Sequence, residues 1–185
     1  MDDLYINKVL EGDYNSFRYF VKTYQKFAYS ISFSILKERT LAEEVVQDSF
    51  IKAWKQLKSF RKDSKFQTWF GRIVINESLR AAKKEGNGIA VLNENPITEV
   101  EVLNDSLAAI CLAEQRHYIE IVFEKLSPSE SLALELYYLK EFSIEEIMEI
   151  TDWSESKTKM LLLRGRKSFY SYLSKVLRTE VKDIL

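Results

Sequence analysis

Residues 41–84 carry apolar side chains at helical spacing, and this stretch constrains the fold more than any other part of the chain. Up to residue 57 the apolar positions recur every three or four residues, as on one face of an amphipathic helix. They are Ala42, Val45, Val46, Phe50, Ala53, Trp54 and Leu57. A polar break from Lys58 to Lys65 follows, and the spacing predicts a second helix over roughly residues 66–84. Together with the helical patterns on either side, this predicts an all-α protein.

The second predicted helix separates charged from apolar side chains. At about 100° per residue, one face holds Arg72, Asn76, Arg80 and Lys83. The opposite face holds Phe70, Ile73, Val74 and Ala81, and Trp69 lies at the edge between them. From Lys58 to Lys84 there are eight basic and two acidic residues, whereas the whole chain has a formal net charge of −1.

Aromatic residues are interleaved with these basic groups, at Phe60, Phe66 and Trp69. Basic side chains neutralise phosphates, and aromatic rings stack on exposed bases. The combination predicts a surface for opened, single-stranded DNA. A solvated basic helix whose aromatic residues belong to the core is the alternative, and composition alone leaves it open.

Composition argues against several classes of protein. The chain has 185 residues, of which 46% are hydrophobic, as expected for one or two small globular domains. The single cysteine, Cys111, allows no internal disulfide, and the single histidine, His117, has no second metal ligand at a suitable spacing. No glycine-rich phosphate loop is present. We therefore expect no cofactor, no metal and no catalytic activity.

The sequence also suggests where the protein acts. The first thirteen residues begin with acids and lack the basic start and apolar core of a signal peptide. No window approaches the ~20 apolar residues needed to span a bilayer. These features predict a cytoplasmic protein that is not inserted directly into a membrane.

The chain divides into two predicted helical domains. Residues 1–84 form a bundle of about four helices, in which Asp13 caps a helix over about 14–36 and Thr40 forms a capping box with Glu43. Residues 85–105 form a linker, and residues 106–185 form the second domain. From Glu85 to Leu126 there are eight acidic and two basic residues, which indicate either a solubilising segment or an acidic tether.

The second domain has the pattern of a helix-turn-helix. Ser127 and Ser143 each begin a capping box, with Glu130 and Glu146 as the third residue of the following helix. A tight turn over residues 151–154 then leads into a long basic helix. A short helix, a tight turn and a longer basic helix place the second helix in the DNA major groove. The side chains expected to point outward are Lys157, Met160, Arg164, Lys167, Ser171 and Lys175.

These segments resemble the two conserved regions of bacterial sigma factors of the sigma-70 family, specifically the extracytoplasmic-function (ECF) group. AEEVVQDSFIKAW, SFRKDSKFQTWFGRIVIN and LRAAKK resemble region two. The helix-turn-helix resembles region four, whose usual form is EEIAEILGISVGTVKSRLHRARKKL. This chain departs from that form at Met160, Leu161 and Leu163, where polar or basic residues are common, and at Asp152, which replaces the glycine of the turn.

The resemblance implies a promoter-specificity subunit that binds RNA polymerase core, recognises and melts promoter DNA, and has an anti-sigma partner. It implies polymerase core binding by Glu44, Gln47 and Asp48. It implies binding of the minus-ten element by Phe60, Arg61, Lys62, Ser64, Phe66, Trp69, Arg72, Asn76, Arg80 and Lys83. It implies binding of the minus-thirty-five element by Lys157, Lys159, Met160, Arg164 and Lys167.

A helix-turn-helix regulator that binds duplex DNA without polymerase is the main alternative. A decoy or adaptor that shares the fold without the activity is another, since fold does not fix function. Dependence on polymerase distinguishes a sigma factor from a regulator, because a regulator should bind its site alone.

Overall fold

The computed structural model describes residues 1–86 and 112–184, with side chains described for residues 1–86 and 118–177. Within these residues the chain forms eight α-helices and no β-strand, which confirms the all-α prediction. Most of the predicted linker, together with Cys111 and the side chain of His117, lies outside the described residues.

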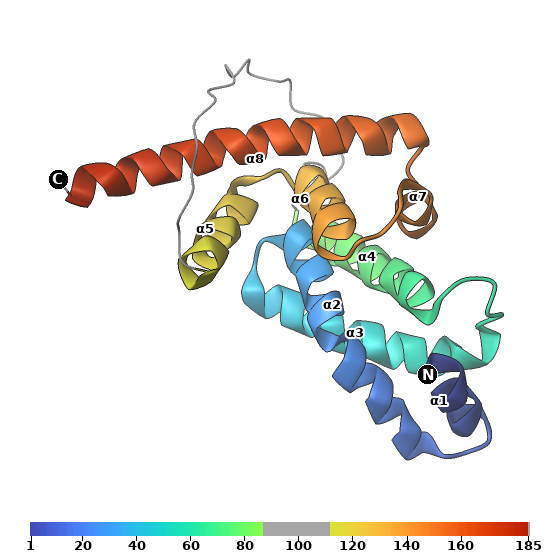
Figure 1. Ribbon diagram of the computed structural model, residues 1–185. Helices are drawn as coiled ribbons and strands as arrows, with labels where there is room; N and C mark the ends of the chain where they lie inside the picture. The colour runs from blue at the N-terminus through green and yellow to red at the C-terminus, as the bar shows by residue number, and fades with distance from the viewer. Residues whose placement is uncertain (87–111, 185) are drawn as a thin grey trace.

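The N-terminal half is built from four helices, α1 (Asp2–Leu10), α2 (Arg18–Leu36), α3 (Arg39–Gln56) and α4 (Phe66–Lys84). Helices α2, α3 and α4 pack against one another around a common core (Figure 1). Phe20, Ile31 and Phe70 are completely buried there. The apolar faces that the sequence predicted for residues 42–57 and 66–84 are therefore the faces that meet in this core.

Helix α1 is held on α2 by polar and aromatic contacts. The carboxylate of Asp2 accepts hydrogen bonds from the hydroxyls of Tyr19 (2.9 Å) and Tyr24 (2.5 Å). The ring of Tyr5 stacks on that of Tyr19, with centroids 4.0 Å apart. These contacts fix the N-terminal helix as part of the first half.

Two helix starts differ from prediction. A 3-10 turn over Tyr14–Phe17 precedes α2, and the Asp13 carboxylate accepts from the Ser16 hydroxyl and caps no backbone amide. The Thr40 capping box is wrong, because α3 begins at Arg39 and Glu38 is its N-cap. The Glu38 carboxylate accepts from two backbone amides of the first turn, and these hydrogen bonds lower its pKa.

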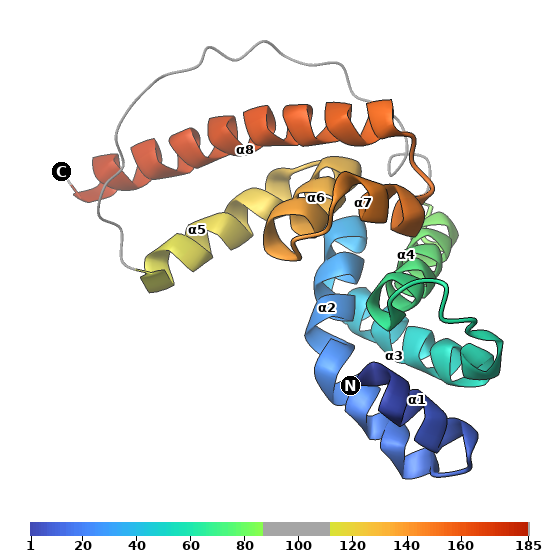
Figure 2. The same cartoon turned by 45° about the vertical axis from the view of Figure 1, so that its right-hand side comes forward.

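The C-terminal half contains α5 (Leu112–Lys125), α6 (Pro128–Leu134), a π-helical turn (Glu135–Leu139), α7 (Ile144–Thr151) and α8 (Glu155–Ile184). The long helix α8 lies across α5, α6 and α7 (Figures 1 and 2). Its inner side closes a small core with α5 and α6. The buried members of that core are Leu126, Ala133, Leu134, Leu161 and Leu162.

The helix-turn-helix begins and turns as the sequence predicts. The Ser143 hydroxyl accepts from the Glu146 amide, and the Glu146 carboxylate accepts from the Ser143 amide at 3.0 Å, so the capping box is confirmed. Asp152 ends α7 in the left-handed conformation, with φ of 58°. Glycine usually occupies such a position, and aspartate is among the few other residues that adopt it readily.

The two halves share one core. Five buried residues of α6, α7 and the segments beside them pack against α2 and α4. Figure 2 shows α7 lying beside α4. Phe142 stacks on Phe27 of α2 with centroids 6.0 Å apart. At Gly71 of α4, an added Cβ would lie 2.2 Å from Cδ1 of Ile150, so glycine permits this close approach. The five residues are Leu132, Leu136, Phe142, Ile147 and Ile150.

Candidate nucleic-acid interface

Helix α4 presents a basic face to solvent. Arg72, Asn76, Arg80 and Lys83 are all exposed, while the opposite side of the helix is buried in the core. We call these four residues the α4 basic face. Their common exposure confirms the helical-wheel prediction, and it places three cations and one amide at helical spacing on the solvent side of α4, the kind of groups that bind a nucleic-acid strand.

The aromatic residues before and at the start of α4 divide into core and edge. Phe60 and Trp69 are half-buried and pack together, with ring centroids 4.9 Å apart. Phe66 is only 2% exposed and packs on Phe20. The expectation that Phe66 offers its ring to a base does not fit this arrangement, because that ring fills the core. Phe60 and Trp69 are the rings within reach of a ligand.

The loop between α3 and α4 carries further polar groups. Arg61 and Lys62 are exposed, and Ser64 is half-buried. Lys62 has a φ of 61°, and its ammonium donates to Asn7 Oδ1 at 3.1 Å and lies 3.4 Å from Asp3. Helix α1 therefore contacts the loop that precedes the basic face, which no local sequence signal indicated.

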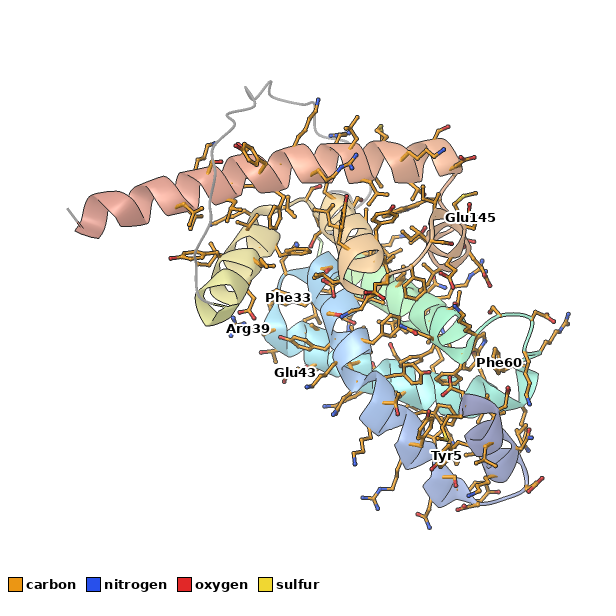
Figure 3. The ribbon with its side chains drawn as sticks, viewed as in Figure 1. Tyr5, Phe33, Arg39, Glu43, Phe60 and Glu145 are labelled. Atoms are coloured by element: carbon orange, nitrogen blue, oxygen red, sulfur yellow. The ribbon has the colours of Figure 1, made fainter. Side chains whose placement is uncertain are left out.

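The start of α3 carries an exposed acidic surface. Glu44, Gln47 and Asp48 all face solvent, while Val45 and Phe50 on the other side of the helix are buried. Figure 3 shows Arg39 and Glu43 at this end of α3, at the opposite end from Phe60. The predicted polymerase-binding residues thus share one face, and that face would complement a basic partner.

The basic residues of α8 differ in how accessible they are. Lys159 and Lys167 are exposed, whereas Lys157 is half-buried with its ammonium 5.6 Å from the centroid of the Trp153 ring. Met160 is half-buried and packs against the small core of the C-terminal half. Of the three unusual apolar residues, Leu161 is buried and Leu163 is 49% exposed.

The expectation that Arg164 points outward is wrong. Its side chain is 13% exposed, and Nε lies 3.8 Å from Oε1 of Glu130, which is itself buried. A buried carboxylate requires a cation nearby, and Arg164 supplies it. Arg166, two residues further along α8, is exposed, and its guanidinium donates to the Tyr138 hydroxyl at 3.4 Å.

Comparison with known protein families assigns both halves. Residues 20–87 match the family model for sigma-70 region 2, and residues 117–169 match the model for sigma-70 region 4. The chain belongs to the sigma-70 family, in its ECF group. As an ECF sigma factor, it binds RNA polymerase core and directs promoter-specific initiation of transcription.

Relatives from distant bacteria resemble this sigma factor over nearly its whole length. It is 26% identical to the ECF RNA polymerase sigma-E factor of Salmonella typhimurium strain LT2 over 96% of both chains. It is also 26% identical to the ECF RNA polymerase sigma factor SigW of Bacillus subtilis strain 168, covering 97% of this chain and 96% of that one.

Two solved structures share the fold. One is the sigma factor RpoE of Bartonella quintana in complex with the anti-sigma factor NepR, with a TM-score of 0.62, 22% identity and coverage of 85% of this chain and 96% of that one. The other is CnrH in complex with the cytosolic domain of CnrY, with a TM-score of 0.61, 19% identity and coverage of 93% and 96%.

Acids of region four pair with basic residues of region two. Lys65 Nζ lies 2.8 Å from Oε1 of Glu146, and this pairing raises the pKa of Lys65 and lowers that of Glu146. A guanidinium nitrogen of Arg72 lies 2.5 Å from Oδ1 of Asp152. The sequence pattern indicated only local roles for these acids, a capping box for Glu146 and a turn for Asp152.

A third link between the regions involves a lysine that the sequence placed only in a turn. Lys37 ends α2 in the left-handed conformation, and its ammonium donates to the backbone carbonyl of Phe123 on α5 at 2.7 Å. Burial lowers the pKa of Lys37 to about 8, although Glu124 and Glu135 nearby act in the opposite direction. No pattern in the sequence distinguishes this lysine from an exposed one.

The described part of the chain offers little for other chemistry. Within it, no group of three or more histidine, cysteine, aspartate or glutamate side chains is arranged to hold a metal ion. None of its helices combines the length and the apolar character needed to cross a membrane. As a family, sigma factors are initiation factors without enzymatic activity of their own.

Proposed function

We propose that this sigma factor holds the opened non-template strand of its promoter on the α4 basic face. The observation that supports this most strongly is the set of four exposed polar residues on α4, with the half-buried rings of Phe60 and Trp69 at the start of the helix. Arginine and lysine neutralise phosphates, and the aromatic edges can stack on an unpaired base.

Holding the single strand is what makes melting favourable. Unstacking a base step costs roughly a few kcal/mol, so a protein drives opening only when it binds the opened strand better than the duplex. Asn76 is the one uncharged member of the α4 basic face, and its amide can both donate to and accept from a base edge. We assign it the selection of a base, and we assign phosphate contacts to Arg61, Arg72, Arg80 and Lys83.

The other two surfaces complete the assignment. The acidic face of Glu44, Gln47 and Asp48 docks on polymerase core, by resemblance on the clamp helices of the largest subunit. Lys157, Lys159 and Lys167 contact the duplex at the minus-thirty-five element, with α8 in the major groove. An anti-sigma factor is a further expected partner, because the related RpoE structure contains one. The protein acts in the cytoplasm and catalyses no reaction.

The decisive experiment compares Asn76→Ala with Asn15→Ala, an exposed asparagine far along the chain from the basic face. Purified variants are combined with polymerase core and tested for run-off transcription on a promoter-fragment library. We expect Asn76→Ala to lose about tenfold or more in discrimination among promoters, because a lost base contact costs about 1–3 kcal/mol.

Affinity for polymerase core should stay the same in both variants. Unchanged promoter choice in Asn76→Ala would contradict the assignment of the reading residue. Tight, sequence-specific binding of a promoter fragment by the wild-type chain without polymerase would instead favour the duplex-binding regulator.

A further inference from the structure

The side chain of Lys37 has a defined position at the turn between α2 and α3, and the proposed function does not use it. Lys37 ends α2 in the left-handed conformation, and its ammonium donates to the carbonyl of Phe123 at 2.7 Å. Phe123 belongs to the last turn of α5, where backbone carbonyls lack partners within the helix. The amine therefore caps that helix and is held in one place, unlike the ammonium of an exposed lysine.

Lys37 also lines an open cavity of about 530 Å³. The cavity lies where the α2–α3 turn, the end of α4 and the start of α6 meet. Sites for small organic molecules have volumes of roughly 300–1,000 Å³, so the space is large enough for such a ligand. Ile35 and Ala82 in its wall are each 3% exposed, so the wall is continuous with the core. The apolar residues of the wall are Ile35, Leu36, Leu41, Ala82 and Pro128.

The surroundings of the Lys37 amine make it a nucleophile. Burial lowers its pKa to about 8, whereas a lysine in water has a pKa of about 10.4. At a pH of about 7.4, roughly 20% of such amines are neutral, compared with about 0.1% of ordinary lysines. Only the neutral amine has the lone pair that attacks a carbonyl carbon. Lysines that form Schiff bases are activated by burial of this kind.

The charges around the amine select the class of compound that reacts with it. Three carboxylates line the cavity, those of Glu38, Glu44 and Glu85, and Lys37 is the one base among the lining residues. Glu124 and Glu135 are close enough to act on the pKa of Lys37, in the direction opposite to burial. These acids would repel an anionic acyl donor, and acylation would abolish the positive charge that they stabilise. A neutral aldehyde avoids both effects, because the iminium that it forms stays cationic.

We propose that Lys37 is a covalent binding site for small apolar aldehydes, which occupy the adjoining cavity as a reversible Schiff base. The amine lone pair attacks the carbonyl carbon, and the oxygen takes up a proton to give a carbinolamine. Loss of that oxygen as water forms the C=N bond. Overall, the neutral amine, the aldehyde and one proton give an iminium and one water.

The iminium fits the site on both sides. It keeps one N–H that can donate to the Phe123 carbonyl, and its organic group lies against the apolar wall of the cavity. Addition of water reverses the reaction and releases the aldehyde. The site is separate from the α4 basic face, so this proposal does not depend on the function proposed for that face.

The first test measures where the folded chain reacts. The full chain is incubated with benzaldehyde and sodium cyanoborohydride, which reduces each imine to a stable benzylamine, and peptide mass spectrometry follows labelling at each lysine. Lys26 is the internal control, because it is exposed on α2. At a pH of about 7.4, we expect Lys37 to be labelled about tenfold faster, since its larger neutral fraction outweighs its restricted access. Equal or slower labelling of Lys37 would overturn the proposal.

The same reaction in concentrated urea shows whether the preference comes from the fold. Both amines are then hydrated, so the two lysines should be labelled at rates within about twofold of each other. Selectivity that persists in urea would trace the preference to the neighbouring sequence and would also overturn the proposal.

The second test examines the class of aldehyde with a matched pair of probes. Para-carboxybenzaldehyde has the ring of benzaldehyde and an added carboxylate, which the acids of the cavity should repel. Normalising the labelling of Lys37 to that of Lys26 removes the difference in intrinsic reactivity between the probes. We expect this ratio to be about threefold lower for the anionic probe. An unchanged or higher ratio would overturn the assignment to neutral, apolar aldehydes.

Discussion

The two basic helices α4 and α8 are alike in composition and differ in what they contact. Each carries exposed cations and has a buried glycine on its inner side. Gly71 of α4 meets Ile150 of the other region, whereas Gly165 of α8 meets Leu134 of its own region. Arg72 pairs across the regions, whereas Lys159 pairs with Glu155 one turn earlier on α8. The surface on α4 therefore depends on the arrangement of the regions, and the surface on α8 does not.

Substituting the two glycines should give the largest contrast. An alanine at position 71 would place Cβ 2.2 Å from Ile150 Cδ1 and 3.1 Å from Phe27 Cζ. We expect Gly71→Ala to lower the free energy of unfolding by about 2–3 kcal/mol, the upper range for overpacking, despite the better helix propensity of alanine. Gly165→Ala should lower the free energy of unfolding by about 1 kcal/mol or less, because the added Cβ would approach no atom more closely than Leu134 Cγ, at 3.0 Å. Urea unfolding of both variants provides the comparison.

An Ile150→Ala background shows whether the Gly71 effect crosses between the regions. Removing the Ile150 side chain should abolish most of the cost of Gly71→Ala and leave that of Gly165→Ala unchanged. Equal costs of Gly71→Ala in both backgrounds would place the strain within region two.

The second prediction uses the pH dependence of Lys37, which joins the α2–α3 turn to α5. Burial holds its pKa at about 8, below the value of about 10.4 in an unfolded chain. Between these values the folded state binds fewer protons than the unfolded state, so the free energy of unfolding should rise with pH through this window. We expect a rise of about 1–2 kcal/mol that Lys37→Met lacks.

Denaturant unfolding of wild type and Lys37→Met at several pH values measures this difference. Lys26→Met is the control, because Lys26 is exposed on the same helix. A wild-type profile that parallels that of Lys37→Met would show that the ammonium is hydrated in the folded protein.

The smallest expected effect concerns the salt dependence of DNA binding by the free chain. Lys167→Gln on α8 should reduce the slope of log affinity against log salt for duplex DNA by about 0.9, because one phosphate contact is lost. Arg72→Gln should change that slope little, since Asp152 already neutralises Arg72. A similar loss of slope in the two variants would show that the basic side chains of α4 are as available to DNA phosphates as those of α8.

Local patterns in the sequence predicted local structure well. The capping box at Ser143, the tight turn that contains Asp152 and the common face of Arg72, Asn76, Arg80 and Lys83 all depend on residues within one or two helical turns. Periodicity also identified the apolar sides of α3 and α4. Such signals depend on backbone geometry and on near neighbours along the chain, so they can be recognised in the sequence without knowledge of the tertiary structure.

What the sequence did not reveal depends on partners that are distant along the chain. The spacing of Ile147 and Ile150 is typical of an apolar helix face, but nothing local indicates that this face packs against region two. Arg164 faces inward because Glu130, over thirty residues earlier, is buried beside it. Phe66 fills the core because the ring of Phe20 is there to meet it. Helical periodicity predicts which face of a helix is apolar, but it does not predict which part of the chain packs on that face.

The two oxygens of the Glu146 carboxylate serve different parts of the molecule. Oε2 accepts from the Ser143 amide at the start of α7, and Oε1 accepts from the Lys65 ammonium of region two. Truncating this side chain would therefore remove the cap at the start of α7 and, at the same time, the ion pair with Lys65 of region two. Only an isosteric exchange that preserves one acceptor can separate those two consequences, and a library that samples alanine alone would confuse them.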